Sequence, residues 1–226
     1  MKSAFSIFIY LFLYCTIITP QAKAPDKSSI EMSKSNTLFI GCGIPIGDFG
    51  SNSATIKEAG FALSGLSFAY EMANPENTIP GMLTLGVALN PIDEESLTKI
   101  NQTQFPNNHV TLSTGSYVNV TSMLGLQLET SVIPEIKLYG LAQGGVLFSY
   151  MPDWEIKVDN NSATQTFQIS TSFAYEFGAG AKIYNTFNIG IRYLAANTEY
   201  VTTINENEFK MPLSTSILQI MAGIMF

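Results

Sequence analysis

The sequence predicts an all-β fold, namely an eight-stranded antiparallel up-and-down transmembrane β-barrel. Three observations predict it. Eight stretches alternate apolar and small or polar residues with a period of two, which is the periodicity of a strand. The connections between them alternate between long and short. Charged residues are almost absent from the eight stretches, and the chain ends on an apolar strand.

The first four predicted strands are 37–47, 60–72, 82–90 and 117–129. In 37–47 the apolar side is clear, although Pro45 lacks a donor N–H and should weaken the far end. In 60–72 the parity is unclear, because Phe61 and Leu63 oppose Leu66 and Phe68. The third and fourth strands alternate more clearly, and their apolar faces carry Leu83, Leu85, Val87, Leu89, Val118, Val120, Leu124, Leu126 and Leu128.

The last four predicted strands are 136–150, 167–183, 187–195 and 215–226. Three of them set bulky apolar residues against Gly, Ser, Gln and the occasional charge. The final strand contains no charge, and its outward stripe is expected to be Leu218, Ile220, Ala222, Ile224 and Phe226. No stretch of useful length shows the 3.6-residue period of a helix.

The connections support a barrel that crosses a membrane. Residues 48–59, 91–116, 151–166 and 196–214 form long connections, whereas 73–81, 130–135 and 184–186 form shorter ones. Long loops on one side and short turns on the other are typical of an outer-membrane barrel, and both termini then lie on the short-turn side. Strands of about 9–11 residues are long enough to cross.

The first 24 residues resemble a secretory signal peptide. Lys2 gives a positive start, residues 4–18 are apolar, and Ala22-Lys23-Ala24 fits a cleavage site. A transmembrane helix is the alternative, but the run is short of the roughly 20 residues that a helix needs. We therefore expect a signal peptide over 1–24, a flexible leader over 25–36 and an outer-membrane barrel over 37–226.

The charge distribution argues against nucleic-acid binding and for lipid outside the barrel. The formal charge of −7 becomes −9 without residues 1–24, because Lys2 and Lys23 are lost. An acidic chain lacks the basic patch that phosphates require. A soluble lipocalin-like barrel is the main rival fold, but it would place its apolar stripes inside and charges on its outward faces.

Five of the six charges in the predicted strands lie opposite the apolar stripes: Glu129, Lys137, Glu176, Lys182 and Arg192. We expect them to point into the lumen and to form a structural charge network, since buried charges must be paired. The alternative is that they line a gated pore or a proton path. Glu71 cannot be assigned to a face, and we expect water near it because it lies close to a strand end.

The sequence gives little support for catalysis or for a metal or other cofactor. The one histidine, His109, lies in a long connection without a fixed partner, so a rim enzyme is the weakest hypothesis. One His and one mature Cys, Cys42, supply no metal-ligand cluster, and we expect no cofactor. We expect Tyr150, Trp154, Phe167, Tyr193 and Tyr200 to form interfacial aromatic girdles, and a ligand platform is the weaker alternative.

Several segments resemble a known family. Phe39-Ile-Gly-Cys-Gly-Ile-Pro-Ile-Gly-Asp-Phe-Gly50, Gly60-Phe-Ala-Leu-Ser-Gly-Leu-Ser-Phe-Ala-Tyr70, Gly140-Leu-Ala-Gln-Gly-Gly-Val-Leu-Phe148 and the terminal Phe226 are similar to the small outer-membrane β-barrel (porin-like, OmpA-type barrel) proteins of Bacteroidota. The resemblance implies folding by the outer-membrane assembly machinery, which is expected to read the last strand with Phe226 and Ile224. It supplies no catalytic residues.

These inferences together predict a monomeric protein of the bacterial outer membrane, surrounded by lipid. Its leading role is structural or surface-interacting, with a lumen closed by side chains. A small passive channel is the second hypothesis, and a lipid-modifying enzyme at the rim is the third.

Overall fold

The computed structural model describes residues 36–52, 59–73, 81–159, 161–204 and 207–226. The predicted signal peptide and all but the last residue of the predicted leader lie outside this part of the chain. All the elements considered below belong to one compact unit, Ser33–Phe226.

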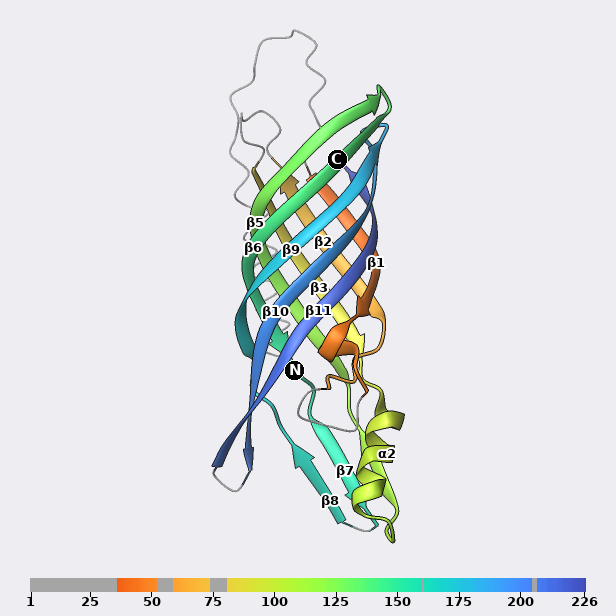
Figure 1. The fold of residues 1–226 in the computed structure, drawn as a ribbon, viewed down its shortest axis with the longest axis vertical. Coiled ribbons are helices and arrows are strands. Elements are labelled where there is room, and N and C mark those ends of the chain that lie inside the picture. Colours follow the sequence, from red (N-terminus) through yellow and green to blue (C-terminus); the bar gives the residue numbers. More distant parts are fainter. Residues whose placement is uncertain (1–35, 53–58, 74–80, 160, 205–206) are drawn as a thin grey trace. The chain divides into compact units, whose positions relative to one another are not determined.

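Eight strands close into an antiparallel barrel in the order β1-β11-β10-β9-β6-β5-β3-β2 (Figure 1). Each barrel strand pairs with the next barrel strand along the chain. Strand β1 closes the ring against β11, with Thr37 opposite Met225 and Pro45 opposite Ile217. The predicted fold class is confirmed. The strands are β1 (Asn36–Pro45), β2 (Gly65–Ala73), β3 (Gly81–Pro91), β5 (Ser116–Ile133), β6 (Ile136–Tyr150), β9 (Ser170–Ile183), β10 (Phe187–Ile204) and β11 (Asn207–Met225).

The two ends of the barrel differ. At one end, which we call the terminal end, β1 begins, β11 finishes, and the chain makes its short turns. The turn at 184–186 is a tight hairpin as predicted, with Tyr184 and Asn185 at φ +52° and +48° and the Thr186 N–H donated to the Ile183 carbonyl at 3.1 Å. At the other end, the cap end, the chain makes its long excursions (Figure 1).

Alternate side chains point outward and are exposed, although they are large and apolar. Their exposed fractions run from 38% at Val146 to 71% at Phe173. Residues between them point inward and are buried, as the period of a strand requires. The outward set on the barrel strands includes Leu38, Ile40, Leu66, Phe68, Leu124, Leu126, Leu128, Leu138, Val146, Phe148, Phe173, Phe177, Phe187, Ile189, Ile191, Ile220 and Ile224.

This distribution excludes the soluble lipocalin-like rival. That fold needs Leu126 and Ile189 in its core, but they are 48% and 49% exposed, whereas Glu176 and Arg192 are buried. A continuous apolar exterior of this size is far larger than the patches that soluble monomers expose. The outward surface is therefore a lipid-facing surface.

The sequence suggested that the long connections are loops. In the structure they carry helices and strands at the cap end. The connection after β3 forms α2 (Glu94–Gln104) and β4 (Val110–Ser113), so the expectation of no helix was wrong. The connection after β6 forms β7 (Trp154–Val158) and β8 (Asn161–Gln165), which make a three-stranded sheet in the order β4-β7-β8. A short 3-10 helix, η1 (Gly47–Gly50), follows β1.

The last predicted long connection, 196–214, is mostly strand. The β10–β11 ladder continues without a break from Phe187 opposite Ile224 to Ile204 opposite Asn207, so this hairpin extends beyond the point where β9 and β1 leave it. Together α2, β4, β7, β8 and this hairpin extension form what we call the cap. Within the described residues no helix is both long and apolar enough to cross a membrane.

Two strand starts also differ from prediction. Residues 60–64 are not part of β2, because Phe61 adopts φ +52° and Ala62 forms only an isolated bridge with Ile92. This break explains why the parity of 60–72 was unclear: Phe61 belongs to the cap end, whereas the true outward stripe of β2 begins at Leu66. Residue Phe167 likewise precedes β9 and bridges to Thr202.

Candidate functional site

The terminal half of the lumen contains a buried charge cluster centred on Arg192. Its guanidinium Nη2 lies 2.7 Å from Glu71 Oε1, and its Nη1 lies 3.7 Å from Glu176 Oε1. All three residues are at most 3% exposed. Gln143 donates from Nε2 to Glu176 Oε1 at 2.9 Å. The three charges come from β2, β9 and β10, so the cluster ties together three strands around the ring.

The buried position of Glu71 differs from the prediction. This residue was expected near water at a strand end, but it is buried and forms the shortest contact of the cluster. The signal that could have placed it is the stripe formed by Leu66 and Phe68, which sets Ser67, Ala69 and Glu71 on the inward face. The misassigned strand start at Gly60 hid this stripe.

A second ion pair lies nearer the terminal end. Lys182 contacts Glu129, which also accepts a hydrogen bond from Gln127 at 2.7 Å. Lys137 lies opposite Lys182 in the β6–β9 register and is half-buried. The five predicted lumen residues therefore separate into two groups. Glu176 and Arg192 join Glu71 in the centre, whereas Glu129, Lys137 and Lys182 lie at the terminal end.

Large side chains in the lumen pack against inward-facing glycines. A Cβ on Gly180 or Gly190 would lie 2.5 Å from the Tyr139 hydroxyl, and one on Gly223 would lie 2.7 Å from the Phe39 ring. The Phe39 ring in turn lies 4.4 Å from the Arg192 guanidinium carbon, a cation–π contact. The inward glycines thus provide the space that Tyr139, Phe39 and Arg192 occupy.

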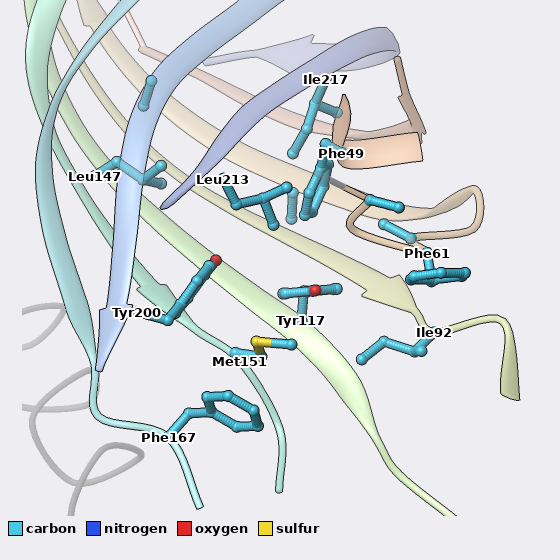
Figure 2. Close-up of a cluster of buried hydrophobic side chains, with 14 of the residues drawn as sticks. Phe49, Phe61, Ile92, Tyr117, Leu147, Met151, Phe167, Tyr200, Leu213 and Ile217 are labelled. Carbon is cyan, nitrogen blue, oxygen red and sulfur yellow. The ribbon is translucent and has the colours of Figure 1, made fainter. Parts of the chain in front are cut away.

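The cap half of the lumen is filled by an apolar cluster, which we call the plug (Figure 2). Inward residues of the four barrel strands β5, β6, β10 and β11 meet there: Tyr117, Met123, Leu147, Leu194, Tyr200, Leu213 and Ile217 are at most 5% exposed. Phe49 of η1 reaches into the same cluster, with its ring 4.9 Å from that of Tyr117. The sequence predicted a polar, charged filling and did not predict this apolar one.

Hydrogen bonds hold the polar atoms of the plug. The Tyr117 hydroxyl donates to the Gly60 carbonyl at 2.9 Å, so it ties the segment after η1 into the mouth of the barrel. The Tyr200 hydroxyl and Ser149 Oγ are 2.6 Å apart, and Ser149 donates to Asn119 at 2.5 Å. The plug is therefore fixed by both packing and hydrogen bonding.

Three aromatic residues expected in interfacial girdles lie in this core instead. Tyr200 is fully buried in the plug, and Trp154 and Phe167 pack edge to face with ring centroids 5.3 Å apart. They are 6% and 7% exposed. The prediction was wrong because Tyr200 faces inward on β10, and Trp154 and Phe167, which lie in the connection between β6 and β9, pack into the same buried cluster. Tyr150 and Tyr193 are only half-buried.

The cap surface is acidic and held by local contacts. Its lysines Lys99, Lys157 and Lys210 each pair with a glutamate on the same element or hairpin. Asp159, at the turn after β7, accepts hydrogen bonds from the Asn108 side chain and the His109 backbone N–H, which hold the pKa of this carboxyl below its usual range. His109 itself is exposed.

In the described part of the chain, no group of three or more His, Cys, Asp or Glu residues is arranged to hold a metal ion. Cys42 is a free thiol on the outward face of β1. Ile224 and Phe226 are each 58% exposed on the outer surface. The Phe226 N–H is donated to the Asn36 carbonyl at 2.9 Å, so the last residue is hydrogen-bonded across the closing seam.

No protein-family model and no curated protein matches the chain. Among solved structures, the chain is similar to Ail, the attachment invasion locus protein of Yersinia pestis, at 16% identity and a TM-score of 0.47, over 86% of this chain and 100% of that one. It is similar to the outer-membrane protein AlkL at 17% identity and a TM-score of 0.46, over 90% and 95% of the two chains. It is similar to Neisserial surface protein A at 10% identity and a TM-score of 0.39, over 84% of this chain and 96% of that one. Values this low do not indicate a function.

Proposed function

We propose that this protein is an integral barrel of the bacterial outer membrane, with a lumen closed by its own side chains, that presents the cap at the cell surface. Its role is structural or surface-interacting rather than conducting. The observation that carries this proposal is the plug, which occupies the cap half of the lumen with buried apolar side chains from the strands around it.

The lipid-facing exterior supports the membrane location. The only spanning structures whose backbone is fully hydrogen-bonded in lipid are helices and closed barrels, and this sheet is closed. An even number of antiparallel strands with elaborated connections at one end is the architecture of outer-membrane barrels, and this supports a cap on the outside and a terminal end that faces the periplasm.

The cap supports a role at the surface. It is not a set of bare loops, because α2 packs on β4, β7 joins β4 to β8, and the β10–β11 hairpin continues the barrel wall outward (Figure 1). A closed barrel does not need an ordered cap in order to stay in the membrane. The simplest explanation for the ordered cap is that the protein displays a fixed outer surface.

The second candidate, a small passive channel, is disfavoured by the same plug. An eight-stranded barrel is just wide enough for side chains to fill, and a buried apolar cluster opposes the passage of ions. Catalysis at the rim has no support either, since His109 is exposed and Asp159 meets it through the backbone N–H.

We infer that the assembly machinery reads the outward Ile224 and Phe226, and that the protein works as a monomer.

Conductance in planar lipid bilayers tests the closed lumen. We expect no resolved single-channel current from the wild-type protein, because the plug is packed and hydrogen-bonded. The triple variant Phe49→Ala, Tyr117→Ala, Tyr200→Ala should give measurable current, since it removes three rings from the lumen.

The matched control replaces three outward residues, Leu124→Ala, Leu126→Ala and Leu128→Ala, and should remain silent. A well-resolved current from the wild-type protein, with steps that the plug variant does not change, would refute the closed lumen and favour the channel.

A further inference from the structure

The lumen charge cluster contains one more negative than positive group. Two carboxyl groups, Glu71 and Glu176, face one guanidinium, Arg192. Lys182 is engaged by Glu129 at the terminal end. If both carboxyls were ionised, a buried charge would remain without a partner, which is strongly unfavourable in a protein interior.

The distances show which carboxyl is left over. Glu71 lies 1.0 Å closer to the guanidinium than Glu176 does, at 2.7 Å against 3.7 Å. Glu71 also faces the Thr84 hydroxyl at 3.5 Å. The ion pair of Arg192 is therefore with Glu71, and Glu176 depends on Gln143.

Gln143 and Glu176 make one hydrogen bond, whereas an amide and a carboxylic acid side by side can make two. Gln143 donates from Nε2 to Glu176 Oε1 at 2.9 Å, and the two residues are directly opposite in the β6–β9 register. The other end of the amide, Gln143 Oε1, is buried and has no hydrogen-bond donor in the described part of the chain. A carboxylate cannot donate to it, whereas a carboxylic acid can.

We propose that Glu176 binds a proton in the folded barrel at neutral pH and forms a cyclic acid–amide pair with Gln143. The bound proton donates from Glu176 to Gln143 Oε1, satisfies that acceptor and leaves a neutral Glu71–Arg192 pair beside it. The lumen is then a proton-binding site as well as a structural core, a property that does not depend on what the cap binds.

The other groups around this site are consistent with one bound proton. The lumen-facing groups, taken strand by strand, are Phe39 on β1, Glu71 on β2, Thr84 on β3, Gln127 and Glu129 on β5, Lys137, Tyr139 and Gln143 on β6, Lys182 on β9, Asn188 and Arg192 on β10, and Gln219 on β11. The positive charges among them are Lys137, Lys182 and Arg192. Arg192 is paired with Glu71 and Lys182 with Glu129, whereas Lys137 is half-buried at the terminal end, opposite Lys182.

Infrared spectroscopy tests the proposal directly. A protonated carboxyl group has a C=O stretching band that carboxylates lack. Folded protein in detergent at neutral pH should show this band, and thermally unfolded protein at the same pH should lose it, because exposed carboxyls are ionised there. Comparison of the two states needs no variant.

The variant Glu176→Gln should lose the band while keeping the heat resistance of the folded form on unboiled gels, since an amide can make the same reciprocal pair with Gln143. The control Glu135→Gln changes an exposed turn residue and should keep the band. Absence of the band from folded wild-type protein, or its survival in folded Glu176→Gln, would overturn the proposal.

Discussion

At the scale of single residues, the lumen shows how few charges decide the inside of a barrel. Arg192 is 1% exposed and contacts two carboxyls and an aromatic ring. Burying these groups costs solvation, and their mutual attraction recovers it only because the geometry is fixed by three strands. Removing one member leaves the others without compensation.

Replacement of Arg192 by Ala should therefore destabilise the barrel strongly, by about 3–5 kcal/mol, because Glu71 would become a buried charge without a partner. The measurement is the temperature at which the folded band on an unboiled gel converts to the unfolded one. Lys157→Ala, which breaks an exposed pair, is the control and should change little. Equal loss in both variants would count against a structural role for the lumen cluster.

The sequence predicted the inward direction of Glu129, Lys137, Glu176, Lys182 and Arg192, since alternation alone fixes the face once a stripe is clear. It could not predict the central ion pair. Which charges meet depends on the stagger of strands around the ring, and Glu71 comes from β2, whose start was misplaced. The sequence did not predict the apolar plug. Met123, Leu147 and Ile217 are single apolar residues on faces that are otherwise small or polar, so the pattern of those faces predicts a polar interior.

At the scale of elements, the cap depends on local capping contacts. The α2 helix begins after Asp93, whose side chain accepts the Ser96 backbone N–H at 3.0 Å and the Ser96 hydroxyl at 2.6 Å. These hydrogen bonds lower the pKa of Asp93 below its ordinary value of 3.8. The helix packs Leu97 into the core that also includes Leu112 of β4.

Asp93→Ala should loosen α2 by about 1 kcal/mol, the usual cost of losing an N-cap. Because the folded pKa is lower than the unfolded one, the stabilisation is present above pH 3.8 and is lost as the pH falls through the folded pKa. Amide hydrogen exchange of α2, corrected for intrinsic rates, should therefore show a difference between wild type and variant at neutral pH that shrinks in acid. Glu95→Gln is the control; a difference that persists unchanged in acid would contradict this assignment.

Elements with clean alternation could be predicted almost to the residue, as 136–150 and β6 show. The cap elements could not, for two physical reasons. The α2 segment has few apolar residues, so its helical period is weak, although Asp93 followed by Glu94 and Glu95 is a helix-start signal. The β10–β11 extension carries Glu199 and Lys210, and charged residues in a sequence are typical of a loop. In the structure these two residues form an ion pair across the hairpin, which the sequence pattern does not indicate.

At the scale of the whole molecule, the orientation of the barrel is the step that connects the fold to a role at the surface. Cysteine placed at Ser162 of β8, in a background with Cys15 and Cys42 changed to Ala, should react with a membrane-impermeant maleimide on intact cells. Cysteine placed at Glu135, in the opposite turn, should react only after the envelope is permeabilised. The reverse pattern would place the cap in the periplasm.

The claim on which the rest depends is that the apolar stripes contact acyl chains. Quenching of tryptophan fluorescence by brominated lipids tests it most directly, because the chain has one tryptophan, Trp154, which is buried in the cap. Ile189→Trp in a Trp154→Phe background should be strongly quenched, whereas Trp154 in the wild-type protein should be quenched little. Strong quenching of Trp154 together with no quenching of a tryptophan at position 189 would contradict the lipid-facing surface. It would also contradict the location of the barrel in the membrane.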